Sequence, residues 1–126
     1  MREAIPFRGN SAAIIYSEHF LEHLDYPEPA KRFLEECHRI FKPGGIFSVG
    51  VPDTEWPLQA YAGPARIDDI NYHFRQDGEH RFAYDFETLH LALMEAGFSN
   101  IKQRSFDANL DTESRRIGTL YVEAVK

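Results

Sequence analysis

Two histidines and a glutamate stand close together in residues 19–23, His-Phe-Leu-Glu-His. In a helix, His19 and His23 would share one face because they are four residues apart, and both imidazoles could hold one Zn²⁺. Glu22 could then serve as the general base of a metal-assisted hydrolysis. That chemistry needs a helix that continues past the motif, and Asp25 and Pro27 follow it almost at once. Zinc hydrolysis is therefore the weakest hypothesis, and we expect no metal ligands.

A short turn between a strand and a helix explains the same residues more simply. In this interpretation Leu21 and Leu24 are buried, while the polar pair Glu22 and His23 faces outward. The residues just before the turn have a better prospect of binding a ligand, because they directly follow a strand.

The elements around this turn are predicted from apolar spacing. Residues 12–16 and 46–51 are short apolar runs typical of strands. Between them, apolar residues recur at steps of three and four over residues 30–41, which predicts an amphipathic helix that ends at the Lys-Pro-Gly-Gly of residues 42–45. Strand, helix and strand of this length predict a parallel pair with a right-handed crossover. Ligands of such sheets bind beyond the carboxyl ends of the strands, at Ser17, Glu18 and His19 and at Pro52 and Asp53.

The second half of the chain completes an α/β pattern. Residues 54–69 predict a loop with at most one short helix around Leu58, and residues 71–85 form a connector rich in His, Arg and aromatic side chains. Asp85 is expected to cap a helix that runs to about Ala96. Residues 100–106 predict a weak edge strand, residues 107–118 a polar loop, and residues 119–125 a final strand.

Composition limits the classes of function. The 126 residues are expected to form a single domain over 1–126, and their formal net charge is −6. No cluster of Lys and Arg is present, so neither nucleic acid nor an anionic membrane is an expected partner. Cys37, the only cysteine, lies on the apolar helix face and is expected in the core. With no apolar stretch of about 20 residues and no signal-peptide pattern, a cytoplasmic protein is expected.

Several short motifs, taken in order, resemble one known family. The first half contributes Ile5-Pro6-Phe7, the run from Tyr16 to Leu24, Lys42-Pro43-Gly44-Gly45 and Val51-Pro52-Asp53, and the second half Phe74-Arg75, Tyr84-Asp85-Phe86, Ala96-Gly97-Phe98 and residues 120–126. Together they resemble the second half of a class I S-adenosylmethionine-dependent methyltransferase of the type 11 group, in a short bacterial subfamily.

The resemblance implies a partial Rossmann-like sheet of parallel strands with crossover helices and an antiparallel last strand. It also implies S-adenosylmethionine as cofactor. In the family, a glycine-rich turn after the first strand holds this cofactor, and no Gly-x-Gly follows any predicted strand here. The resemblance therefore leaves open whether this chain alone is active.

Site residues are carried over position by position. The remaining cofactor wall would consist of Pro6, Phe7, Ser17, Glu18 and His19. Catalytic candidates are His19, Asp53, His73 and His80, and the acceptor would contact Arg75 and Tyr84.

Two functions remain after the zinc hypothesis. One is methyl transfer to a small-molecule or glycan-like acceptor, by in-line displacement assisted by positioning and a base. The other is a non-catalytic binding or dimerisation module derived from the same fold. Because the first predicted strand would leave an open edge, we expect either a homodimer formed through residues 12–16 or a rearranged segment that covers this edge.

Overall fold

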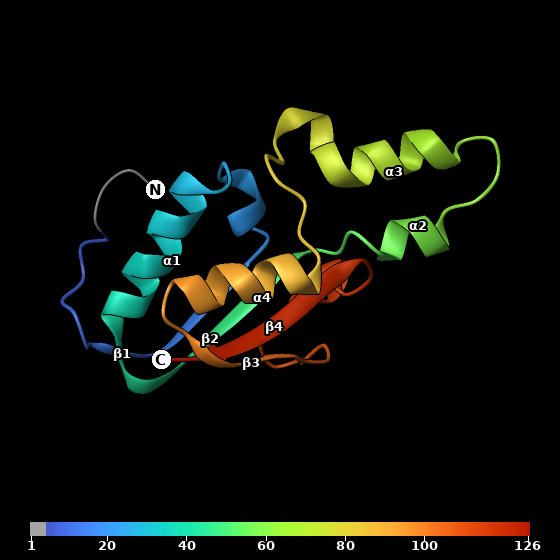
Figure 1. Ribbon diagram of the computed structural model, residues 1–126. Helices are drawn as coiled ribbons and strands as arrows, with labels where there is room; N and C mark the ends of the chain where they lie inside the picture. Colours follow the sequence, from blue (N-terminus) through green and yellow to red (C-terminus); the bar gives the residue numbers. More distant parts are fainter. Residues whose placement is uncertain (1–4) are drawn as a thin grey trace.

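The computed structural model describes residues 5–126 and contains one four-stranded sheet (Figure 1). The strands are β1 (Ala12–Glu18), β2 (Phe41–Pro52), β3 (Ser99–Gln103) and β4 (Thr119–Val125), in the spatial order β1-β2-β4-β3. β1 and β2 are parallel, whereas β4 runs antiparallel to both of its neighbours, β2 and β3. The predicted α/β class, the parallel first pair and the reversed last strand are confirmed.

Two long helices lie over one face of the sheet (Figure 1). α1 (Glu28–Ile40) buries the stripe predicted from its spacing, Ala30, Phe33, Leu34, Cys37 and Ile40. α4 (Phe86–Glu95) lies beside it and buries Leu89, Ala92 and Leu93. The side chains that meet them alternate along β2 and β4: Phe47, Val49, Val51, Leu120, Val122 and Ala124. Each large apolar side chain buried in this way contributes about 1.5 to 3 kcal/mol to folding.

α4 begins as the sequence predicts. The Asp85 carboxylate accepts a hydrogen bond of 2.8 Å from the Thr88 amide, which satisfies one of the free N–H groups of the first turn. Beyond the helix, Gly97 adopts a φ of +110°, a conformation that L side chains rarely tolerate. This cap and this glycine fix both ends of α4 over the sheet.

The region between β2 and α4 is more helical than predicted. It contains α2 (Trp56–Ala60), α3 (Arg66–Arg75) and the short 3₁₀ turn η2 (Gln76–Gly78). α2 is the short helix expected around Leu58. α3 falls within the expected loop over residues 54–69 and the expected connector over residues 71–85, so this part of the expectation was wrong. α3 escaped prediction because Ile70 is its only buried residue, and helices with so little apolar surface give a weak periodic signal. β2 also begins earlier than expected, at Phe41, because α1 already ends at Ile40.

The second face of the sheet is covered by the polar segment after β3. Arg104 donates a hydrogen bond of 3.0 Å to Ser48 Oγ on β2, and its guanidinium lies 4.9 Å from the centre of the Tyr121 ring. Asp111 accepts a hydrogen bond of 3.0 Å from the Tyr16 hydroxyl on β1. This segment, which includes η3 (Glu113–Arg115), is thus anchored to three strands.

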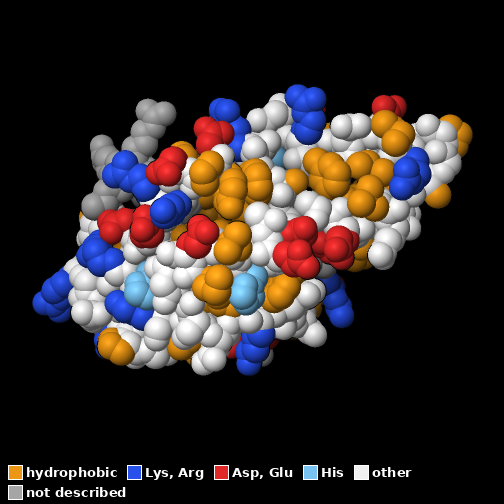
Figure 2. All heavy atoms as spheres, viewed as in Figure 1, with side chains coloured by type: hydrophobic (Ala, Val, Ile, Leu, Met, Phe, Trp, Pro, Cys, Tyr) orange, Lys and Arg blue, Asp and Glu red, His pale blue; other side chains and the backbone are white. Residues whose placement is uncertain are grey.

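β1 lies at the edge of the sheet, and within residues 5–126 it pairs only with β2. Ile14 on this strand is 67% exposed. On the face drawn in Figure 2, basic side chains are scattered among acidic and hydrophobic ones. None of the helices in the described part of the chain is long and apolar enough to cross a membrane.

Candidate functional site

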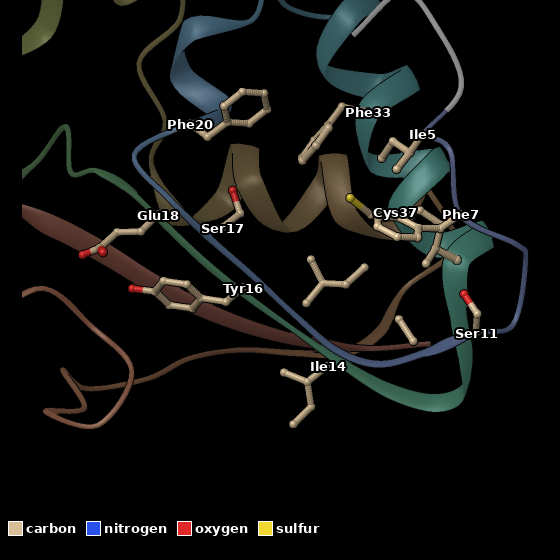
Figure 3. Close-up of a pocket in the computed structure, with 13 residues that line it drawn as sticks. Ile5, Phe7, Ser11, Ile14, Tyr16, Ser17, Glu18, Phe20, Phe33 and Cys37 are labelled. Carbon is tan, nitrogen blue, oxygen red and sulfur yellow. The ribbon is translucent and has the colours of Figure 1, made fainter.

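A groove of about 690 Å³ runs along the exposed edge of β1. Phe20, Phe33 and Cys37 lie on the α1 side of the strand, and Ile14 lies on the opposite side (Figure 3). The lining is mostly apolar and is completed by Ile5, Phe7, Ser11, Ala12, Ile15, Tyr16, Ser17, Glu18 and Ile40. Its volume falls in the range of small-molecule sites, which is about 300 to 1,000 Å³.

Three of the residues predicted to contact the cofactor, Phe7, Ser17 and Glu18, line this groove. Ser17 Oγ is buried and has no hydrogen-bond partner among the described residues. Glu18 is held in place because its carboxylate accepts hydrogen bonds of 3.2 and 2.8 Å from the backbone amide and hydroxyl of Thr112. Pro6 is exposed and does not belong to the lining.

A second, more polar pocket of about 320 Å³ lies at the carboxyl ends of β1 and β2. It brings together His19, His73 and His80, three of the four predicted catalytic residues. The rest of its wall is formed by Pro52, Gln76, Ser114, Arg115, Ile117 and Gly118. The rule that ligands bind beyond the carboxyl ends of parallel strands thus located a real cavity.

His19 connects the two cavities, since it follows Glu18 directly. Its backbone has a φ of +53°, an uncommon conformation for a residue with a side chain that is often found at functional sites. Its Nε2 lies 2.7 Å from Thr119 Oγ1. Burial, helped by the nearby Arg115, lowers the pKa of His19 to about 4, so the ring is neutral at pH 7.

His73 and Asp53 interact in a way that the sequence did not indicate. His73 Nε2 lies 2.8 Å from the Asp53 carbonyl oxygen, so this nitrogen carries the proton and Nδ1 of the neutral ring has a free lone pair. The Asp53 carboxylate accepts a hydrogen bond of 3.1 Å from the Glu55 amide. In this conformation Asp53 supports a turn and orients His73, and it does not line the polar pocket.

The two predicted acceptor contacts lie elsewhere. Tyr84 is fully buried in the core and packs against Tyr26 and Phe82, where no acceptor can reach it. Its aromatic neighbours explain the position, because a large apolar ring gains most free energy when it is enclosed. Arg75 is exposed at the end of α3, outside the lining of the polar pocket.

Glu22 is the largest departure from expectation. The predicted short turn exists as η1 (Leu21–His23), but Glu22 is 1% exposed and does not face outward. Its Oε2 lies 3.8 Å from His19 Nδ1, 3.8 Å from His23 Nε2 and 3.7 Å from His80 Nε2. Burial raises the pKa of Glu22 to about 7. The spacing His-x-x-Glu-His indicated that His19, Glu22 and His23 lie close together, but no local pattern in the sequence predicts that His80 joins them.

Comparison with known proteins confirms the resemblance to class I S-adenosylmethionine-dependent methyltransferases. A sequence model described as a methyltransferase domain matches residues 2–49. Among solved structures, a SAM-dependent methyltransferase from Archaeoglobus fulgidus superposes with a TM-score of 0.66 at 19% identity, over 95% of this chain and 62% of the other. The fold of this chain is therefore the Rossmann-like methyltransferase fold.

Two further structures agree. A S-adenosylmethionine-dependent methyltransferase from Mesorhizobium loti gives a TM-score of 0.62 at 19% identity, over 97% of this chain and 65% of the other. A SAM-dependent methyltransferase from Aquifex aeolicus gives a TM-score of 0.57 at 20% identity, over 99% of this chain and 51% of the other. The chain thus spans less than two thirds of each of these three proteins. None of the curated proteins matches the sequence.

Proposed function

We propose that this chain forms the acceptor side of a S-adenosylmethionine-dependent methyltransferase site for a small-molecule acceptor. The observation that carries the proposal is the placement of two cavities on either side of the adjacent residues Glu18 and His19. The apolar part of the groove suits the adenine ring of the cofactor, Ser17 and Glu18 form a polar wall of the groove, and the polar pocket suits the acceptor. Methyl transfer requires such neighbouring sites, because the nucleophile must lie about 3 to 3.5 Å from the methyl carbon.

The chemistry assigned to the polar pocket is an in-line displacement. S-adenosylmethionine held in the groove would supply the methyl group. A lone pair of the acceptor would bond to the methyl carbon as the bond from that carbon to sulfur breaks, and S-adenosylhomocysteine would leave. The acceptor loses a proton, which a neutral imidazole can take. His19 and His73 are the candidates, because both line this pocket. His73 is the stronger candidate, since its Nε2 donates to the Asp53 carbonyl oxygen and leaves Nδ1 as the accepting nitrogen. The lowered pKa of His19 makes it the weaker base.

The groove is open along the edge of β1, which supports a second part of the proposal. We propose that two copies pair through residues 12–16, so that the partner covers the groove. An exposed strand edge is a template for such pairing, and the exposed apolar side chains Phe7 and Ile14 lie beside it. Each copy would then complete the cofactor site of the other.

Ligand binding tests the first part. Titration calorimetry with S-adenosylmethionine and S-adenosylhomocysteine should show saturable binding. Phe7→Ala should weaken it about five- to tenfold, because the ring at the groove wall is lost while it contributes little to the core. Leu58→Ala is the matched control, since Leu58 is also a half-exposed apolar side chain but lies on α2 outside the groove. Equal effects of both variants would contradict the assigned groove.

Light scattering tests the second part. The wild type should have twice the 14.6 kDa mass of one chain, and Ile14→Lys should be monomeric because a charge at the edge prevents strand pairing. Ile67→Lys, at a 62% exposed site on α3, should stay dimeric. A dimer that binds neither cofactor nor product would instead support the non-catalytic module. A monomeric wild type would refute pairing through β1.

A further inference from the structure

The side chains of Glu22, His23 and His80 converge from two separate segments. Glu22 and His23 belong to η1, and His80 follows η2, almost 60 residues later. One ligand atom from each of the three lies within 4.8 Å of the other two. Both imidazoles present Nε2 to the same carboxylate oxygen, at 3.8 and 3.7 Å.

The Glu22 carboxylate is buried without a partner. Both of its oxygens are inaccessible, and neither accepts a hydrogen bond from any described residue. Distances of 3.7 and 3.8 Å exceed the limit of a nitrogen to oxygen hydrogen bond, so the histidines surround the carboxylate without bonding it. A buried carboxylate without a hydrogen-bond partner is unfavourable. A cation between the three side chains would remove this cost.

The histidine orientation is fixed in the way that metal ligands require. His23 Nδ1 lies 2.9 Å from the Glu79 carbonyl oxygen, so Nδ1 carries the proton and the lone pair of Nε2 points to Glu22. The Glu22 carbonyl oxygen accepts hydrogen bonds from the amides of Arg81 and Phe82, at 2.7 and 3.3 Å. These bonds clamp the two segments together and hold His80 over the carboxylate.

We infer that Glu22, His23 and His80 bind one divalent first-row transition metal ion, for which Zn²⁺ is the natural probe. Two imidazole nitrogens and one carboxylate oxygen are a common ligand set for such ions. Ligands about 2.0 to 2.1 Å from a tetrahedral Zn²⁺ are roughly 3.3 Å apart. Each histidine nitrogen must therefore approach the Glu22 oxygen by about half an ångström. No two of the three ligand atoms are more than 4.8 Å apart, so side-chain adjustments of at most about 1.5 Å bring the set together. The inference revises the expectation of no metal, and it does not depend on methyl transfer.

The fourth coordination position of this ion would face the polar pocket. His80 lines that pocket, and so does His19, whose Nδ1 lies 3.8 Å from the same Glu22 oxygen. The fourth ligand is therefore His19 or a small molecule in the pocket. The continuous helix of zinc hydrolases is not needed, since His80 supplies the ligand that a helix would otherwise provide.

Metal titration tests this inference on the whole chain. After removal of metals with a chelator, calorimetry with ZnCl₂ should show one equivalent bound. Glu22→Gln and His80→Gln should each weaken binding at least about tenfold, because each removes a direct ligand. His90→Gln is the matched control, since His90 lies on α4 next to Phe86 and outside the cluster. It should bind as the wild type does.

A second readout separates ligation from folding. Co²⁺ should give the visible absorption of a four-coordinate nitrogen and oxygen site in the wild type and in His90→Gln, and lose it in Glu22→Gln. His23→Gln, at a more exposed position, gives an independent test if either buried variant is unstable. Substoichiometric binding by the wild type would overturn the inference, and so would equal affinity of the wild type and the three cluster variants.

Discussion

Asp111 holds the polar segment to the second face of the sheet, and its removal is the sharpest test of the fold. Its side chain is fully buried, and that of Arg104 is 12% exposed. The two carboxylate oxygens accept hydrogen bonds of 2.7 Å each from Arg104 Nη1 and Nη2, which is a bidentate pair. Tyr16 and the Asp107 amide donate two more, at 3.0 and 2.7 Å.

Asp111→Ala should lower the free energy of unfolding by about 3 to 5 kcal/mol, because it leaves the Arg104 charge buried without its partner. For a domain of this size, that corresponds to a fall in melting temperature of roughly 10 to 20 °C. Thermal and urea unfolding followed by circular dichroism measure both quantities. The polar pocket should loosen as well, since Ser114, Arg115 and Ile117 of its wall belong to the same segment.

Two milder variants provide the comparison for the loss of unfolding free energy in Asp111→Ala. Tyr16→Phe removes one hydrogen bond to Asp111 and should cost about 0.5 to 1.5 kcal/mol. Glu113→Ala breaks an exposed ion pair with Arg116 at 3.7 Å and should cost less than about 1 kcal/mol. If Asp111→Ala loses no more than Glu113→Ala, the polar segment is not anchored as described.

Three further predictions concern the same unfolding measurements. Asp85→Ala should cost about 1 kcal/mol because the amide of Thr88 loses its acceptor, whereas Asp85→Asn should keep most of the cap; equal losses in both would contradict this role. Phe47→Ala should cost about 3 to 5 kcal/mol, since Phe47 is fully buried against Phe41, and a loss below about 1 kcal/mol would argue against that packing. The hydrogen bonds from Arg104 hold the pKa of Asp111 below its usual range, so its stabilisation is complete above the unfolded value near 4 and is lost as pH falls through the folded value. The stability difference between wild type and Asp111→Ala should therefore shrink from about pH 4 downward, and a constant difference down to pH 2 would refute the pairing.

The parts of the fold that were predictable from the sequence have strong periodicity or explicit caps. These are the apolar stripe of α1, the alternation of β2 and β4 and the cap at Asp85. Each can be recognised from residues that are neighbours in the sequence. α3 could not be recognised in this way, because most of its residues face solvent and Ile70 is its one buried residue. Its apolar side chains therefore do not form a regular buried stripe. The anchoring of residues 104–118 was hidden as well, since the partners of Arg104 and Asp111 lie on strands distant in sequence.

The candidate site was predictable to the extent that topology determines it. The carboxyl ends of β1 and β2 placed Ser17, Glu18 and His19 at the cavities before any side chain was located. His73 and His80 were found by composition alone, because a connector so rich in histidine is unusual. Composition does not tell which histidine meets which partner, and it placed Tyr84 at an acceptor instead of in the core.

The burial of Glu22 shows why that partner could not be read from the sequence. A carboxylate on a short 3₁₀ turn is normally solvated, and only a covering segment can enclose it. The covering segment here is held by backbone hydrogen bonds from Arg81 and Phe82 to the Glu22 carbonyl, which depend on no side-chain type. Those bonds bring His80 to the carboxylate. They can form because the chain that follows α3 and η2 passes next to η1, at the carboxyl end of β1. The segment from η2 to His80 contributes Gln76 and His80 to the wall of the polar pocket, so the burial of the carboxylate and one side of the pocket have a common origin.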